Sequence, residues 1–144
     1  MLVQQILNSK SDSAVVTVAP GTTVAAAVAL LSARRIGALI VTADGRQVDG
    51  ILSERDIVRE LGRKGPSVLT QPVESIMTAR IVACARQDPA VQVMQRMTDG
   101  RFRHMPVMDG DAMVGVISIG DVVKARLSEL EMEMGALEGM IKGF

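Results

Sequence analysis

The sequence predicts an α/β (α+β) fold of two tandem β-α-β-β-α repeats, packed by their sheets about a pseudo-twofold axis, with an extended C-terminal helix. The segment GILSERDIV (50–58) returns as GVISIGDVV (115–123), and upstream residues match at an offset of 66, as Val24 matches Ala90. In both halves, short apolar runs bounded by turn residues alternate with amphipathic helical patterns. One three-stranded sheet has too little core alone, so the two copies are expected to share one.

Each repeat is expected to contain the same elements in the same order. A short helix (3–10; 73–80) leads into an extended segment (15–18; 81–84), followed by an amphipathic helix (23–34; 89–99). Two strands around a polar turn come next (38–42 and 49–53; 104–108 and 113–118), and a closing helix starts after each serine. We expect repeat 1 at 1–62, a linker at 63–72, repeat 2 at 73–127 and a C-terminal helical extension at 128–144. The segment 62–72, which carries two glycines and two prolines, is expected to be exposed.

The final helix carries an apolar seam whose members are spaced alternately four and three residues apart: Val123, Leu127, Leu130, Met134, Leu137 and Ile141. This spacing is typical of a coiled coil or helix bundle. Gly135 and Gly139 weaken any helix but permit close helix approach. A dimer contact and a tail packed on its own domain are the two interpretations, and the first is favoured.

Composition excludes several classes of function. Sixteen basic and sixteen acidic residues give zero net charge, which argues against a nucleic-acid-binding surface. The single cysteine excludes an internal disulfide, and its expected role is that of a small buried residue. The first residues lack the pattern of a secretory signal, and the longest apolar run has eight residues (24–31), too short to span a membrane. A cytoplasmic location is expected.

The sequence contains few residues and no motifs that are typical of an enzyme active site. His104 is the only histidine and Cys84 the only cysteine, and no nucleophile elbow, phosphate-binding loop or metalloprotease motif is present. Asp56 and Asp121 belong to two repeats, so they are expected in two related clefts rather than around one substrate. We therefore expect no enzyme and no catalytic cofactor or metal.

The repeated Gly-h-h-Ser-x-x-Asp motif, where h is apolar, fits both a structural and a binding role. Ser53 and Ser118 can each cap the helix that follows, and Asp56 and Asp121 then suit the positive end of its dipole. A carboxylate can also accept hydrogen bonds from the two hydroxyls of a ribose, and a helix start can bind phosphate. A local basic cluster, 101–104, precedes a strand of the second repeat, where a solvated turn is the simpler interpretation.

The paired repeats, the motifs GILSERD and GVISIGD, and FRHMPV in the second repeat resemble the cystathionine-β-synthase (CBS) domain pair, or Bateman module. The likeness extends from about Leu2 to Leu127. It implies a non-catalytic regulatory module that binds an adenosine-containing ligand, AMP above all but also ADP, ATP, NAD(H) or S-adenosylmethionine, in clefts between the repeats. It also implies a homodimer and signalling by conformational change to a separate downstream protein.

The resemblance also implies two nucleotide-binding clefts. In one, Asp121 would bind the ribose, Ser118 would lie near ribose or phosphate, and Thr17, Ile36 and Gly37 would border the adenine. The mirror cleft is implied to comprise Asp56, Ser53, Val82, Cys84 and Phe102.

Arg103 and His104 match the phosphate-side basic pair of the family, although a packed histidine is the alternative for His104. The first repeat has Gly37 and Ala38 at these positions, so one strong site, or two sites with different ligands, is expected. The alternative function is a structural or protein-interaction module with vestigial pockets, acting through its C-terminal helix.

Overall fold

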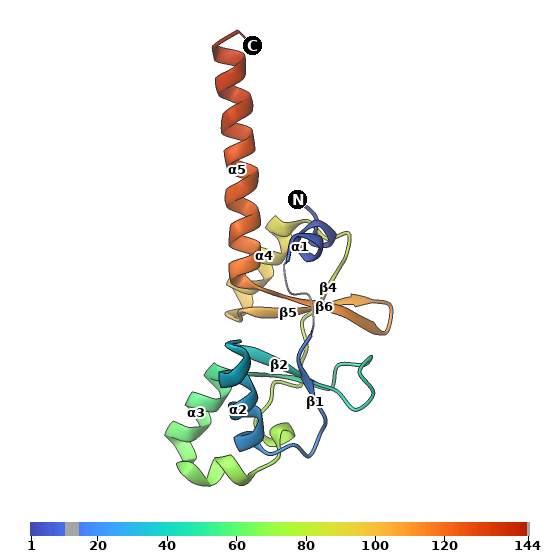
Figure 1. Ribbon diagram of the computed structural model, residues 1–144, viewed down its shortest axis with the longest axis vertical. Helices are drawn as coiled ribbons and strands as arrows, with labels where there is room; N and C mark the ends of the chain where they lie inside the picture. Colours follow the sequence, from blue (N-terminus) through green and yellow to red (C-terminus); the bar gives the residue numbers. More distant parts are fainter. Residues whose placement is uncertain (11–14, 144) are drawn as a thin grey trace. The chain divides into compact units, whose positions relative to one another are not determined.

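The computed structural model describes residues 1–10 and 15–143. Residues 11–14 and Phe144, the last residue of the predicted extension, lie outside the described residues. The described chain forms two compact units. Unit 1 draws on Met1–Ser13, Ala83–Asp109 and Val114–Phe144, whereas unit 2 draws on Ala14–Val82 and Gly110–Met113. Each unit contains one three-stranded sheet (Figure 1).

Unit 2 contains the predicted β-α-β-β-α order of the first repeat: β1 (Thr17–Val18), α2 (Val24–Arg34), β2 (Ala38–Val41), β3 (Gly50–Ser53) and α3 (Glu54–Lys64). β1 pairs in parallel with β2, and β2 pairs antiparallel with β3. Thr23 caps α2, since its hydroxyl oxygen accepts a hydrogen bond from the N–H of Ala26. The apolar faces of α2 and the sheet enclose Val24, Leu39 and Leu52, all almost completely buried.

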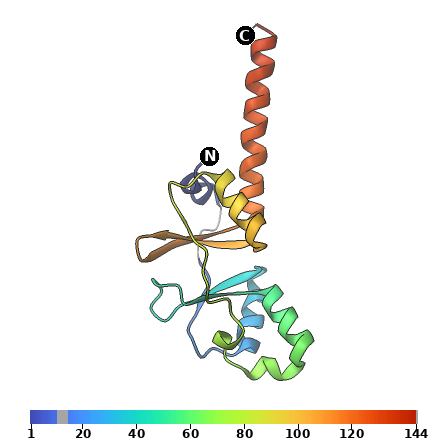
Figure 2. The ribbon, with the colours of Figure 1, turned by 180° about the vertical axis from the view of Figure 1, so that it is seen from behind.

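Unit 1 repeats this order with β4 (Cys84–Ala85), α4 (Ala90–Gly100), β5 (His104–Asp109), β6 (Ala112–Ser118) and α5 (Ile119–Ile141). β4 is parallel to β5, which lies beside β6. The core of this sheet encloses Val93, Met105 and Ile117. α5 has 23 residues and extends well beyond α4 (Figures 1 and 2).

The short segment that begins each repeat packs on the sheet of the other repeat. α1 (Val3–Ser9) belongs to unit 1, where the N–H of Val3 donates to Asp88 O at 2.9 Å. The corresponding segment at the start of the second repeat belongs to unit 2, where Thr78 and Ile51 form an isolated bridge. A sequence repeat and a compact unit are therefore different segments of the chain.

Gly50 and Gly115, the glycines of the two motifs, leave room for the short segments that pack on the sheets. A Cβ at Gly115 would lie 2.8 Å from Leu7 Cδ2, and a Cβ at Gly50 would collide with the Met77 side chain. Leu7 and Met77 occupy the same place in the two segments that begin the repeats. The group that comes close to each glycine is thus a side chain of the protein itself.

Two local expectations were wrong. The segment 73–80 forms only a 3₁₀ turn, η2 (Val73–Ser75), because the chain straightens to pair Thr78 with Ile51. The segment 62–72 is not wholly exposed. It contains a second 3₁₀ helix, η1 (Pro66–Thr70), which packs on α2 and α3 and buries Val68 completely.

Candidate functional site

The serine and aspartate of the second motif form a closed capping box at the start of α5. Ser118 Oγ accepts a hydrogen bond from the N–H of Asp121 at 3.1 Å, and Asp121 Oδ2 accepts one from the N–H of Ser118 at 2.8 Å. Two backbone donors that the helix cannot satisfy are thereby paired. The capping role predicted for Ser118 is confirmed.

The first motif forms the same box at the start of α3. Ser53 Oγ accepts from the N–H of Asp56 at 3.2 Å, and Asp56 Oδ2 accepts from the N–H of Ser53 at 3.0 Å. The two boxes differ in the cation that reaches each carboxylate. That difference distinguishes the two candidate ribose-binding groups.

At Asp121 the cation comes from a distant part of the chain. Lys10, which ends α1, donates to Asp121 Oδ2 at 2.9 Å and to Val116 O at 2.9 Å. The Asp121 side chain is 24% exposed, and Oδ1 accepts no hydrogen bond from any described residue. Burial by itself would raise the pKa of Asp121, but the hydrogen bonds from Ser118 and Lys10 outweigh it and lower this pKa. Asp121 is therefore an ionised, partly exposed carboxylate whose Oδ2 is fixed by Ser118 and Lys10.

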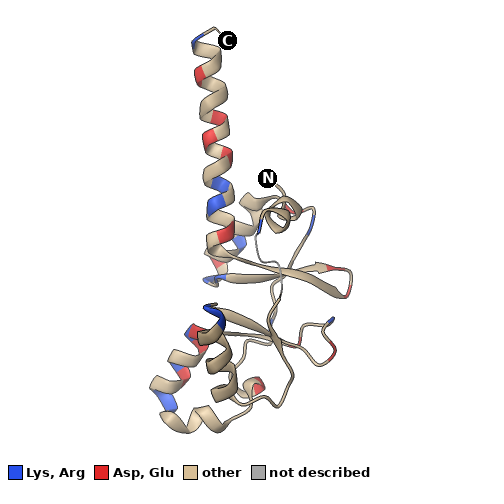
Figure 3. Ribbon diagram, viewed as in Figure 1, with Lys and Arg blue, Asp and Glu red and all other residues tan. Residues whose placement is uncertain are grey.

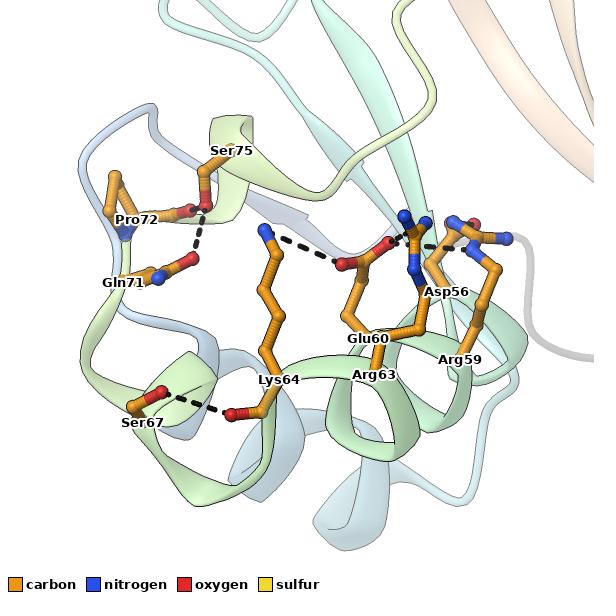
Figure 4. Close-up of polar contacts among 9 residues, drawn as sticks. All are labelled: Asp56, Arg59, Glu60, Arg63, Lys64, Ser67, Gln71, Pro72 and Ser75. Atoms are coloured by element: carbon orange, nitrogen blue, oxygen red, sulfur yellow. Dashed lines mark hydrogen bonds and ion pairs between the residues drawn. The ribbon is translucent and has the colours of Figure 1, made fainter.

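At Asp56 the cation comes from the same helix, and the carboxylate is covered. Arg59 Nη2 lies 3.0 Å from Asp56 Oδ1, and the Asp56 side chain is only 8% exposed. Glu60 lies next in the same charged row, with Arg63 and Lys64 each 3.6 Å away (Figure 4). Both oxygens of Asp56 are thus engaged within unit 2.

The residue just before the middle strand of each sheet, β5 or β2, meets the start of the closing helix of its unit through one backbone hydrogen bond. In unit 1 the N–H of Ile119 donates to Arg103 O at 2.8 Å, and in unit 2 the N–H of Glu54 donates to Gly37 O at 2.9 Å. The exposed Arg103 and the Lys10 ammonium thus lie near the start of α5. In unit 2 the residues that correspond to Arg103 and Ile119 are Gly37 and Glu54. The charges at the start of α5 suit an anionic group better than those at the start of α3.

The other predicted site residues are divided between the units. Unit 2 contains Thr17, Ile36, Gly37 and Val82. Thr17 pairs with Ile40 across the sheet, and Val82 is exposed. Unit 1 contains the half-buried Phe102 and His104 as well as Cys84. The predicted grouping of Thr17, Ile36 and Gly37 with Asp121 draws on both units and stays a prediction.

Cys84 is a core residue of unit 1. Its side chain is 5% exposed, and the thiol Sγ lies 3.7 Å from Pro106 O, to which it donates. Burial raises the pKa of this thiol to about 12, so it is protonated and unreactive near neutral pH. The expectation of a small buried residue is confirmed.

An open pocket of about 490 Å³ lies on the α2 and α3 side of unit 2. Its walls are mainly apolar and include Val28, Ile57 and Val58, and Ile36 and Gly37 also line it. The carboxylate of Asp56 is not among its lining residues. The pocket and the candidate ribose-binding group of this unit are therefore distinct features.

Lys10 is the functional candidate that the sequence did not reveal. It lies 111 residues from Asp121, and its partner becomes evident only when α1 is seen in unit 1. The weak similarity between VQQILNSK (3–10) and VESIMTAR (73–80) marks it as the counterpart of Arg80. That similarity gives no indication of which aspartate it would reach.

Neither a metal cluster nor a membrane-spanning helix is found among residues 1–10 and 15–143. No three histidine, cysteine, aspartate or glutamate side chains in these ranges could hold a metal ion together. The helices in the same ranges are too short or too polar to cross a bilayer.

Comparison with known proteins gives the family. The family model for the CBS domain matches residues 4–63 and 73–128. The mitochondrial CBS domain-containing protein CBSX3 of Arabidopsis thaliana is 37% identical over 84% of this chain and 61% of its own length. A further Arabidopsis CBS domain-containing protein is 30% identical, but the chain spans only 25% of it. The chain thus covers about three fifths or less of these relatives.

Solved structures agree with this assignment. A CBS-domain containing protein from Agrobacterium tumefaciens has 41% identity and a TM-score of 0.83, with 88% of this chain and 99% of that chain covered. A CBS domain protein from Pyrobaculum aerophilum complexed with AMP has 23% identity and a TM-score of 0.77 over 92% of this chain and 99% of that chain. A CBS domain pair complexed with 5′-methylthioadenosine and S-adenosylmethionine has 21% identity and a TM-score of 0.77 over 90% and 98%. The chain belongs to the CBS domain family, as its repeated motif predicted.

Proposed function

We propose that this protein is a non-catalytic regulatory module that binds an adenosine-containing ligand, with the ribose on Asp121. The observation that carries the proposal is the state of that carboxylate. It is ionised, its Oδ2 is fixed by Ser118 and Lys10, and its Oδ1 has no donor among the described residues. A carboxylate that is fixed in place and partly exposed suits the hydroxyls of a ribose.

The surroundings of Asp121 support a phosphate on the same ligand. Arg103 is joined by its backbone to the first residue of α5, and Lys10 lies within hydrogen-bond distance of Asp121 itself. The start of a long helix adds the positive end of its dipole. AMP is the first candidate, with ADP, ATP and NAD(H) as alternatives, and the AMP complex of the Pyrobaculum protein supports this order.

The proposal assigns unequal roles to the two motifs. Asp56 is covered by Arg59 and has Glu54 and Gly37 nearby, where unit 1 has Ile119 and Arg103. A ribose at Asp56 would have to displace Arg59 from this carboxylate, and the Asp56 side chain is only 8% exposed. We infer one strong site at Asp121 and a weaker or unused one at Asp56.

A regulatory output requires a ligand that distinguishes two conformations. Lys10 ties α1 to the first turn of α5, so a ligand on Asp121 would compete for, or add to, a contact between two elements of unit 1. Signalling to a separate downstream protein by this route is part of the proposal. So are a homodimeric state and a cytoplasmic location.

The experiment that tests the proposal is calorimetric titration of protein stripped of bound nucleotide with AMP, ATP, NADH and S-adenosylmethionine. Comparison of AMP with 2′-deoxy-AMP examines the ribose contact directly. Loss of a hydrogen bond to a charged group costs about 1.5–3 kcal/mol, so 2′-deoxy-AMP should bind about 10–100-fold more weakly. Equal affinity for the two would contradict a ribose on Asp121.

A protein-interaction module is the second candidate, and the exposed apolar side chains of α5 favour it. Such a module would bind none of the four ligands while folded. Its partner would still bind the Asp121→Asn variant, whereas a sensor would lose the ligand and the response together.

A further inference from the structure

Lys10 places a positive charge at a fixed position beside the candidate ribose-binding carboxylate. Its ammonium group donates to Asp121 Oδ2 and to Val116 O, both at 2.9 Å. Val116 belongs to β6, so one hydrogen bond joins the ammonium to the sheet and the other joins it to the first turn of α5. The Lys10 side chain is 25% exposed. A charge that is already held in place and still reaches solvent can act on a bound ligand without a further ordering cost.

The first motif has a different arrangement of charge. Arg80 occupies the position of Lys10 in the other repeat and is exposed, whereas Asp56 is paired with Arg59 from its own helix. The contact of Lys10 with Asp121 is therefore a property of the second motif and does not follow from the repeated pattern. Such a residue is a candidate for deciding which ligand this motif accepts.

The charges at the start of α5 favour a negatively charged ligand. The ionised Asp121 carboxylate and the Lys10 ammonium cancel each other. Arg103 is joined by its backbone to Ile119, and the helix start adds the positive end of its dipole. Figure 3 shows basic and acidic positions close together at this end of α5. Without Lys10, the carboxylate would repel a phosphate instead.

A ribose on Asp121 would bring its 5′ group close to Lys10. The 5′ carbon and the 2′ and 3′ hydroxyls belong to one sugar ring, so the 5′ group stays within about the width of a nucleoside sugar from the carboxylate. The Lys10 ammonium lies 2.9 Å from that carboxylate. These separations are comparable with the screening length of about 8 Å at physiological ionic strength, so the lysine and the 5′ group interact.

We propose that Lys10 selects the charge of the ligand at Asp121. It makes this motif specific for adenosine ligands that carry a 5′ phosphate, over adenosine itself and over ligands with a positive 5′ sulfonium such as S-adenosylmethionine. The inference rests on the proposed function, because it takes the ribose on Asp121 as given. It goes further by assigning the choice among adenosine ligands to a residue outside the repeated motif.

A purely structural role for Lys10 leads to a different result. If Lys10 only ties α1 to α5, its loss weakens the binding of adenosine, AMP and S-adenosylmethionine alike. Adenosine has the same base and ribose as AMP but lacks the phosphate. The ratio of the two dissociation constants, measured on one protein, therefore isolates the effect of the phosphate charge from any effect on the fold.

Calorimetric titration of the nucleotide-free full chain with adenosine, AMP and S-adenosylmethionine tests the proposal. In Lys10→Met the affinity for AMP should fall about tenfold, while that for adenosine should change by less than about twofold. The affinity for S-adenosylmethionine should rise. Lys10→Arg, which keeps the charge, should retain the preference for AMP. Arg80→Met, the matched change in the other repeat, should leave all three affinities unchanged.

The salt dependence provides a second measurement. Added sodium chloride should reduce the preference of the wild type for AMP over adenosine more than that of Lys10→Met, because it screens the charge of Lys10. An unchanged ratio of adenosine to AMP dissociation constants in Lys10→Met, even with both ligands bound more weakly, would overturn the role of Lys10 alone. Binding of neither adenosine nor AMP to the folded wild type would instead overturn the ribose site, and the charge selection with it.

Discussion

Lys10 Nζ lies 2.9 Å from Asp121 Oδ2 and joins the end of α1 to the first turn of α5. The two residues are 111 positions apart, and the pair exists because α1 packs on the sheet of the second repeat. The counterpart of Lys10 at the start of the second repeat is Arg80, which is exposed, and Asp56 is paired with Arg59 instead. The two copies of the motif have therefore diverged in the cation that each carboxylate meets.

Replacement of Lys10 by methionine should reduce stability at neutral pH and much less in acid. The pKa of Asp121 is lowered in the folded protein, so this group stabilises the fold above its unfolded pKa of about 3.9. That contribution is lost as the pH falls through the folded pKa. Lys10→Met should cost about 0.5–1 kcal/mol at pH 7, measured by urea unfolding, and the difference from wild type should shrink as the pH falls through the lowered pKa of Asp121.

Lys64→Met is the matched control for this measurement. Lys64 lies 3.6 Å from Glu60 and is 47% exposed, so its loss should change stability little. A loss for Lys10→Met that stays the same while the pH is lowered through the pKa of Asp121 would show that its alkyl chain, and not its charge, stabilises the fold.

Cys84 should react very slowly with Ellman's reagent in the folded protein. With a pKa of about 12, its thiolate is about 1000-fold scarcer at pH 8 than that of a free cysteine, and burial excludes the reagent as well. Reaction should become rapid in 6 M guanidinium chloride. Rapid reaction in native buffer would contradict the buried position of this thiol.

Gly115→Ala should destabilise the protein by about 1–3 kcal/mol, because the new methyl group would lie 2.8 Å from Leu7 Cδ2 and push against α1. Thermal unfolding measures the loss. Gly120→Ala is the control, since its Cβ would meet only Ser118 Oγ at 3.6 Å and alanine favours a helix. Leu7→Ala should cost less in the Gly115→Ala background than in the wild type, and additive losses would exclude the contact.

Much of the fold could be predicted from the sequence because its signals are local. Short apolar runs at 38–42 and 104–108 predicted strands, and Ser53 and Ser118 predicted the starts of the helices that follow. The sequence predicted a short segment at the start of each repeat, but it did not predict which sheet this segment covers. The sheet is decided by contacts between distant residues, such as Leu7 with Gly115. Val68 was missed because prolines and glycines around it are also typical of exposed linkers.

The candidate site was predictable only in its repeated part. Ser118 and Asp121 follow from the motif, whereas Lys10 could not be found, since no sequence pattern links residues 111 positions apart. The contrast between Gly37 and Arg103 did indicate two unequal sites. The structure adds a second contrast in the same direction, the Arg59 guanidinium over Asp56.

The central claim is that one adenine nucleotide binds through Asp121. The most direct test is calorimetric titration of nucleotide-free wild type, Asp121→Asn and Asp56→Asn with AMP, with circular dichroism to confirm folding. Asparagine keeps an oxygen for the capping box but lacks the charge, so both variants should fold. The account predicts one strong site in the wild type, at least tenfold weaker binding in Asp121→Asn and a nearly unchanged affinity in Asp56→Asn. Wild-type affinity in a folded Asp121→Asn would contradict it.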